Sequence, residues 1–329
     1  MAGAVVDPDA PSNRRRMGAL TGSSRSSSAR TSTGPLQECV VVNHVLDLGA
    51  RKFWRLVGKP VDLAVEHSWL RAPMSRSSAV GDGWLSVEAR HHGGTVDEDA
   101  AATGSSAGRA PGLLPAMTIL DGPGFDASRL DPRICDFYEH TAAWHMEVWS
   151  GWSPLFWPAG ELIARLFGRR VEQLSLPMRP LDVAYGMDSR VRVIRDRDGE
   201  QVGAAWLRTL RLSGRYVFSG CYSARRLPGA AQPSVHVAFP LESGNVQVFL
   251  RPVISEGGGL VLESPPGRFG QNGAYVVVHD NGRDFAARVP LHETFRLYCD
   301  PYGVLRTDHE LRIRRTWMMR LHYKMEPAR

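Results

Sequence analysis

The chain has 329 residues, of which 43% are hydrophobic and 22% are charged, as in a globular protein with a substantial core. No apolar run approaches the roughly 18 residues of a transmembrane helix, and the Arg- and Ser-rich N-terminus lacks the apolar stretch of a secretory signal, so we expect a cytoplasmic protein. The formal net charge is +6, and residues 1–35 contribute +3 of it through five arginines and two aspartates. The remaining charge is not clustered on one element, so we expect no nucleic-acid binding.

The composition divides the chain into four stretches. Residues 1–35 are a low-complexity Arg/Ser-rich segment, which predicts a disordered tail. Residues 36–93 contain apolar runs and a strand-like GWLSVEA, and they predict a small α/β segment that packs on the main domain. Residues 94–112 are poor in apolar side chains and predict a flexible linker or insertion. Residues 113–329 are expected to form the main domain.

The first part of the main domain predicts two helices. Residues 133–150 are expected to be helical, with Asp131 as the N-cap and Pro132 at the first helical position. A second helix is expected from Pro158 to Val171, where apolar residues recur at spacings of three and four and basic residues fill other positions.

Beyond Pro180 the apolar residues alternate with polar ones, as in NVQVFLRP and TWMMRLHYKM. Turn-forming residues separate these runs near 197–200, 242–245, 280–283 and 300–303. The pattern predicts nine or ten strands in an antiparallel meander that curls into a barrel. The predicted fold class is therefore α+β, a mostly antiparallel barrel-like sheet with one or two helices packed on it.

Several kinds of site are absent from the sequence. The four cysteines are scattered and have neither a CxxC pair nor the Cys/His spacing of a zinc site, so we expect no metal and no disulfide framework. There is also no GxSxG, P-loop or HExxH motif. We therefore expect no cofactor.

The predicted helix at 133–150 is rich in titratable residues. Asp136, His140 and Glu147 fall on one stripe of the helix, which indicates a solvated face rather than a metal site. His145 falls on the apolar face and is expected to be buried against the sheet. A buried imidazole suits general acid–base chemistry, and the alternative is a core histidine with its hydrogen bonds satisfied.

The same region is rich in tryptophan. Trp144, Trp149, Trp152 and Trp157 lie within fourteen residues and are suited to walling a pocket. Two alternatives are core packing of a helix on the sheet and, together with the basic helix that follows, contact with a membrane surface or a partner.

The last three predicted strands carry charged residues at alternate positions. On an outer face these residues would form cross-strand ion pairs, whereas inside the barrel they would form a cationic lumen. The intervening positions are apolar and favour the outer face. The charged residues are Arg296, Arg306, Asp308, Glu310, Arg312, Arg320, His322 and Lys324.

From about Leu113 to Met325 the sequence resembles a family of uncharacterised actinobacterial proteins. The resemblance is carried by LDGPGFD, DPRICDFYEHTA, VWSGWSP, NVQVFLRP, GRFG and GVLRTDHELR followed by RLHYKM. It covers about two thirds of the chain. It implies a single C-terminal domain and supplies no activity, substrate or catalytic residue.

The sequence favours a binding protein that encloses a small apolar ligand between the sheet and the aromatic helix. One alternative is an isomerase, cyclase or hydrolase that uses His145 or Asp188 as a general base in the same pocket. Another is an interaction protein that docks the Trp-rich segment and the basic helix on a membrane or partner. The expected lining residues are Trp144, His145, Trp149, Trp152, Trp157, Tyr185 and Met187.

Overall fold

The chain divides into two compact units, Met1–Val40 and Val41–Arg329, in a computed structural model. The structure describes residues 52–77, 81–97, 110–153 and 186–328, all in the second unit. The predicted tail at 1–35 and the predicted helix at 158–171 lie outside the described residues, as do residues 98–109 of the predicted linker.

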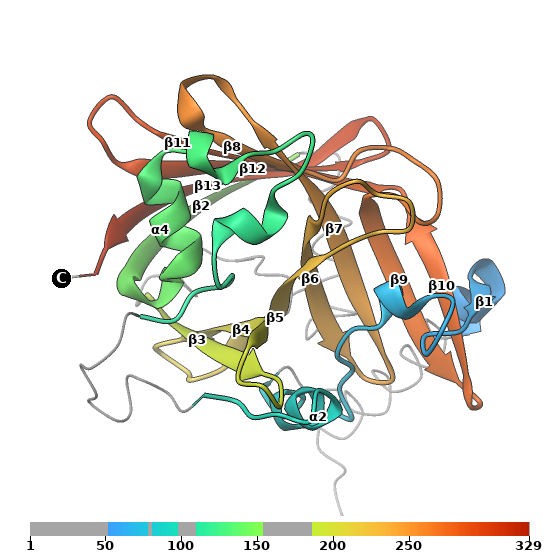
Figure 1. The fold of residues 1–329 in the computed structure, drawn as a ribbon. Coiled ribbons are helices and arrows are strands. Elements are labelled where there is room, and N and C mark those ends of the chain that lie inside the picture. Colours follow the sequence, from blue (N-terminus) through green and yellow to red (C-terminus); the bar gives the residue numbers. More distant parts are fainter. Residues whose placement is uncertain (1–51, 78–80, 98–109, 154–185, 329) are drawn as a thin grey trace, which may run out of the picture. The chain divides into compact units, whose positions relative to one another are not determined.

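The second unit is built on one large antiparallel sheet that curls into a nearly closed barrel (Figure 1). Ten strands pair in the order β2-β13-β12-β11-β8-β7-β6-β5-β4-β3, and β9, β10 and β1 branch from β7. The strands are β1 (Lys59–Val61), β2 (Trp144–Trp152), β3 (Met187–Arg195), β4 (Gln201–Leu210), β5 (Tyr216–Arg225), β6 (Ser234–Leu241), β7 (Gly244–Ile254), β8 (Leu260–Glu263), β9 (Gly273–Asp280), β10 (Arg283–Val289), β11 (Leu291–Cys299), β12 (Leu305–Ile313) and β13 (Thr316–Pro327).

The branch arises because β7 has two partners along one edge. Its first half pairs with β9 from Gly244 to Phe249, and its second half pairs with β8 from Arg251 to Ile254. Strands β9, β10 and β1 therefore continue the sheet away from the barrel wall formed by β8 and β11 (Figure 1).

The predicted fold class is confirmed: the unit is a mostly antiparallel, barrel-like sheet with short helices packed on it. At the predicted turn at 280–283, Asn281 and Gly282 have φ values of 51° and 73°, as a tight hairpin between β9 and β10 requires. Gly199 and Gly303 also adopt positive φ in turns at the predicted places. Strands β3 to β13 follow Pro180, so the described residues of this part of the chain hold eleven strands where nine or ten were expected.

The helix predicted at 133–150 is wrong in its second half. Helix α4 runs only from Pro132 to Glu139, with Asp131 as the N-cap, as predicted. After the short η4 (Thr141–Ala143) the chain becomes strand β2, which pairs with β13. From Trp144 to Trp149 more buried and more exposed side chains alternate, as in a strand. The apolar residues of this segment also fit the spacing of a helix, and pairing with β13 stabilises the strand instead.

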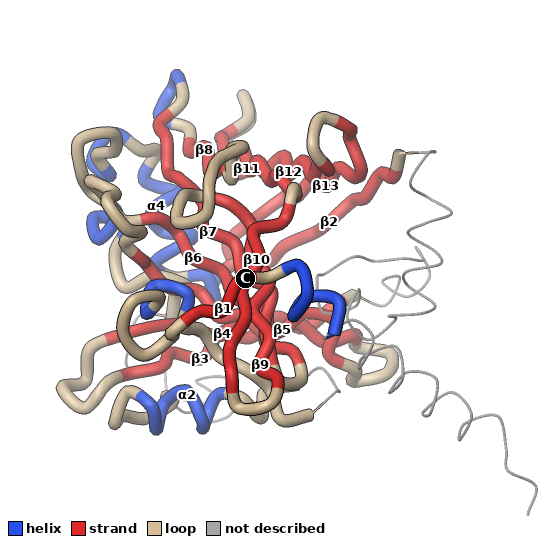
Figure 2. Tube along the Cα trace, turned by 90° about the vertical axis from the view of Figure 1, so that its right-hand side faces the viewer, coloured by secondary structure: helices blue, strands red, loops and turns tan. Residues whose placement is uncertain are grey.

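The GWLSVEA segment is likewise helical rather than extended. Helix α2 (Leu85–His91) buries Leu85, Glu88 and Ala89, and it lies below β3 and β4 in both views (Figure 2). Residues 52–57 are also helical, and further short helices are η1 (Ser68–Leu70), η2 (Met117–Leu120), η3 (Ala127–Arg129) and η6 (Glu256–Gly258).

The described part of the stretch at 36–93 packs on the sheet. The Trp69 ring lies 5.4 Å from Phe249 and 5.3 Å from Tyr275, both fully buried. The Gln247 amide nitrogen donates a hydrogen bond of 2.8 Å to the Leu70 carbonyl oxygen. Both apolar contact and a buried hydrogen bond therefore attach this segment to β7 and β9.

The described start of the predicted linker is also attached to the sheet. The Thr95 nitrogen donates to the Arg195 carbonyl oxygen at 3.2 Å, and the Asp97 nitrogen donates to that of Val193 at 2.9 Å. The Asp97 carboxylate forms an ion pair with the Arg195 guanidinium at 2.9 Å. Residues 95–97 therefore extend the edge of β3.

Candidate functional site

The inward side chains of the barrel leave a cavity of about 180 Å³. Residues of α4, of β2 and of strands β4 to β8 and β11 to β13 line it. Its aliphatic wall includes Val237, Val248, Leu250 and Leu262, each less than 7% exposed. Its aromatic lining residues are Phe137, Tyr138, Trp206, Phe218, Tyr222, Phe239, Phe295 and Tyr323.

Edge-to-face contacts hold the aromatic wall together. The Trp206 ring lies 5.6 Å from that of Phe218 and 5.7 Å from that of Tyr222. Phe137 reaches Trp206 from helix α4 at 6.4 Å. The Trp206 indole nitrogen donates a hydrogen bond of 2.7 Å to the Ser189 hydroxyl. These contacts fix the ring positions and give the cavity a defined shape.

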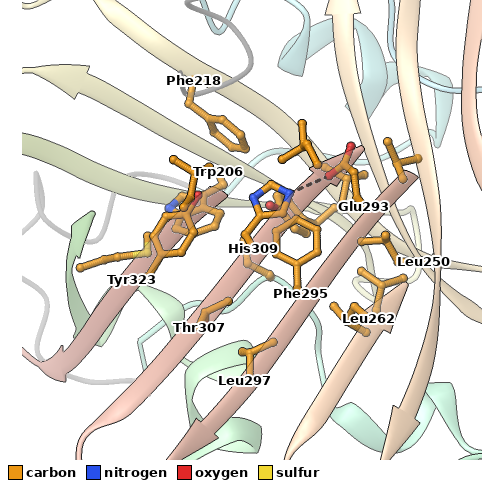
Figure 3. A pocket seen from close by; sticks show the side chains of 18 of the residues that line it. Trp206, Phe218, Leu250, Leu262, Glu293, Phe295, Leu297, Thr307, His309 and Tyr323 are labelled. Atoms are coloured by element: carbon orange, nitrogen blue, oxygen red, sulfur yellow. Dashed lines mark hydrogen bonds and ion pairs between the residues drawn. The ribbon is translucent and has the colours of Figure 1, made fainter. Parts of the chain in front are cut away.

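One histidine and one glutamate form a pair in this apolar wall (Figure 3). Nε2 of His309 lies 3.1 Å from Oε2 of Glu293, and the two side chains are only 9% and 13% exposed. The Phe295 ring stacks on the imidazole with 3.7 Å between centroids and 15° between planes. Phe295 and His309 are directly opposed on β11 and β12, so register places the stack.

Arginine and tyrosine side chains add further polar groups to the lining. Arg208 is 4% exposed, and burial lowers the pKa of its guanidinium. Burial raises the pKa of Tyr323 to about 12 and that of Tyr222 well above its ordinary value. Both phenols therefore keep their protons at neutral pH and present hydroxyl groups that can donate hydrogen bonds.

The cavity thus combines a mostly apolar wall with a few polar groups, which is the usual composition of small-molecule sites. It can surround an apolar body and hydrogen-bond one or two polar atoms on it. Within the described residues, no three His, Cys, Asp or Glu side chains are placed to hold a metal ion. No described helix is long and apolar enough to cross a membrane.

The predicted burial of His145 is wrong. His145 lies on β2 and is exposed, because the strand alternation turns it outward. Its neighbour Trp144 is 8% exposed, and its indole nitrogen donates a hydrogen bond of 3.0 Å to Asp136. Both residues line a separate surface pocket beside α4, and neither lines the barrel cavity.

Trp149 does not line the barrel cavity. Trp149 is 51% exposed and lies on the outer face of β2, with its ring 6.0 Å from that of His322. Trp152 lies at the end of β2, but its side chain is outside the described part. Trp157 and Tyr185 also lie outside the described residues.

Met187 and Asp188 begin β3 and are both half-buried, and neither lines the cavity. The Asp188 carboxylate forms an ion pair of 2.8 Å with Arg211, in which both side chains are about half exposed. An exposed ion pair of this kind contributes little to stability. None of the predicted site residues with described side chains lines the barrel cavity.

The charged residues of the last strands lie on the outer face, as predicted. Asp308 on β12 forms an ion pair of 2.7 Å with His322 on β13. Glu310 forms a second with Arg320 at 3.2 Å. The cationic-lumen alternative is therefore wrong for these residues.

Three inward polar residues were missed: Arg208, Glu293 and His309. Each one is the only acidic or basic residue in its set of alternate inward positions, as Glu293 is among Leu291, Phe295 and Leu297. A single acidic or basic residue in such a set is the sequence signal that could have identified them.

No protein-family model matches the chain, and neither the curated proteins nor the solved structures contain a match to it. The resemblance to actinobacterial proteins therefore stays a prediction.

Proposed function

We propose that the chain is a cytoplasmic binding protein that encloses one compact, largely apolar ligand inside the barrel. The observation that carries this proposal is the cavity of about 180 Å³ with its apolar wall. An apolar cavity of roughly 150 Å³ in another protein binds benzene. The expected ligand is therefore about the size of one substituted ring.

The energetics of packing support an occupant. Native interiors are close-packed and contain few voids larger than a water molecule. At about 24 cal/mol per Å³, an empty apolar cavity of 180 Å³ costs about 4 kcal/mol. A ligand that fills this space restores the missing contacts, so binding and folding stability are coupled.

Native mass spectrometry of the purified protein, followed by solvent extraction, tests this proposal. The wild type is expected to carry a stoichiometric small apolar molecule that the solvent releases. Val237→Phe places a ring in the cavity wall and is expected to abolish the extra mass. Val65→Phe, at a position that is 74% exposed, is the matched control and should retain it.

If the gently handled wild type has only the mass of the chain, and added single-ring compounds leave its thermal midpoint unchanged, the cavity holds no such ligand. Circular dichroism of Val237→Phe checks that loss of the mass reflects a filled cavity rather than a misfolded chain.

The two alternative functions have less support. The enzyme hypothesis places His145 or Asp188 as a base in the ligand pocket, and neither residue lines the barrel cavity. The interaction hypothesis relies partly on Trp157 and the basic helix, which lie outside the described residues. Flotation with anionic vesicles at low salt tests the latter, and failure to float would exclude it.

A further inference from the structure

The two nitrogens of His309 have different surroundings. Nε2 is hydrogen-bonded to the Glu293 carboxylate at 3.1 Å. Nδ1 is buried and has no hydrogen-bond partner. Because a carboxylate only accepts hydrogen bonds, Nε2 is the nitrogen that donates, and in a neutral ring Nδ1 is then an acceptor. A buried acceptor without a partner costs about 1–3 kcal/mol.

The ring of His309 is also held in a fixed orientation. Phe295 stacks on it at 3.7 Å, and the Tyr323 ring is nearly parallel to it at 6.5 Å. Glu293 sets the rotation of the ring by accepting from Nε2 (Figure 3). An acceptor held in this way can select the position of one donor group on a ligand.

The charges in the lining indicate a ligand without net charge. Among the described residues that line the cavity, Arg208 carries a formal positive charge and Glu293 a formal negative charge. The two charges sum to zero. A charged ligand would add an unbalanced charge to a largely apolar space, which is unfavourable.

We infer that the ligand is a neutral ring compound bearing one hydroxyl group, which donates a hydrogen bond to Nδ1 of His309. This inference rests on the proposed function, since it names the chemical class of the molecule that the cavity holds. The ring of the ligand lies against the apolar wall, and its hydroxyl replaces the missing partner of Nδ1.

Calorimetric titration with toluene, phenol and benzoate at pH 8 tests the inference. Toluene and phenol have nearly the same size, so they differ mainly in the hydroxyl group. A site whose polar group needs that hydroxyl discriminates against the molecule that lacks it. Phenol is expected to bind to the wild type about tenfold more tightly than toluene, and benzoate is expected to bind most weakly.

The variant that removes the acceptor is Glu293→Leu combined with His309→Phe. Replacing both partners by apolar residues avoids leaving a lone buried charge, so this variant is expected to fold. Its preference should reverse in favour of toluene, because the phenol hydroxyl would be buried without a partner. The matched control is Asp308→Leu with His322→Phe, which removes the similar pair on the outer face and should keep the preference for phenol.

The outcomes separate this inference from the proposed function. Binding of toluene and phenol with equal affinity would overturn the inference and leave the cavity proposal intact. Tightest binding of benzoate would overturn it in favour of anion recognition by Arg208. Failure of both neutral probes to bind would contradict the proposed function itself.

A measurement on the wild type avoids any doubt about folding of the variants. In ¹⁵N NMR spectra, the Nδ1 resonance of His309 should shift when phenol is added and remain in place when toluene is added. An unchanged resonance with bound phenol would refute the hydrogen bond.

Discussion

A buried histidine outside the cavity makes the stability of this fold depend on pH. His236 is 1% exposed; its Nδ1 lies 3.0 Å from the Ser223 hydroxyl and its Nε2 lies 2.9 Å from the Gln247 side-chain oxygen. Its ring stacks on Phe249 with 4.6 Å between centroids. Burial lowers the pKa of His236 from 6.5 to about 3, and the nearby charge of Arg225 lowers it as well.

The sign of the effect follows from where the proton binds. In the folded state His236 stays neutral down to about pH 3, whereas in the unfolded chain it takes up a proton below about pH 6.5. The unfolded state therefore binds more protons between these values, and the free energy of unfolding decreases as the pH falls. At 1.36 kcal/mol per pH unit, the two units from pH 6.5 to 4.5 remove about 2.7 kcal/mol.

Urea unfolding at pH 7.5, 5.5 and 4.5 measures this loss. His236→Asn removes the titrating group, so its stability should fall by about 2.7 kcal/mol less than that of the wild type between pH 7.5 and 4.5. Carboxylates contribute the same pH dependence to both proteins, so subtracting the stability of His236→Asn from that of the wild type at each pH removes this contribution. Parallel curves for the wild type and His236→Asn would refute the reasoning.

Two further substitutions test the packing of the sheet and of α2. Gly244→Ala would place a Cβ 2.5 Å from the Val277 carbonyl oxygen and is expected to lower the free energy of unfolding by about 2–3 kcal/mol. Its control is Gly151→Ala, where the added Cβ meets no heavy atom within 4 Å, and this variant should change the free energy of unfolding by less than about 0.5 kcal/mol. Glu88→Gln is expected to cost about 3 kcal/mol because it breaks a buried ion pair, whereas Glu66→Gln, whose side chain is 79% exposed, should be neutral. Urea unfolding measures all four, and equal costs within either pair would contradict the packing described.

Much of the sheet could be predicted because alternation and turns are local signals. The outward position of Asp308 and Glu310 and the turn at Asn281 and Gly282 follow directly from a period of two and from the conformational needs of a hairpin. The branch at β7 could not be predicted in this way. It depends on which distant strands reach each half of β7, and alternation does not specify strand partners.

The end of helix α4 illustrates the limit of periodicity. From Trp144 to Trp149 the apolar residues fit both a helix and a strand. The sequence contains no strong stop signal after Glu139. The strand state is stabilised by nine residue pairs with β13, whose members are 167 to 183 positions apart in the sequence (319 − 152 and 327 − 144). The error moved His145 from the predicted buried face to an exposed one.

The candidate site was misplaced for a related reason. The tryptophan-rich segment was expected to line the pocket because large aromatic residues suit pocket walls. The aromatic wall instead includes Trp206, Phe218 and Phe295, which come from separate strands. The Glu293–His309 pair depends on the register between β11 and β12, which no short segment of sequence specifies.

Diffraction from crystals held under xenon gas tests most directly whether the barrel interior is hollow and accessible. Xenon occupies empty apolar cavities. The account predicts a xenon peak between Leu250, Leu262 and Phe295 in ligand-free wild-type protein, and no peak there in Val237→Phe. Side chains packed tightly through this space in the wild type, with no xenon among them, would contradict the central claim that the barrel encloses a ligand.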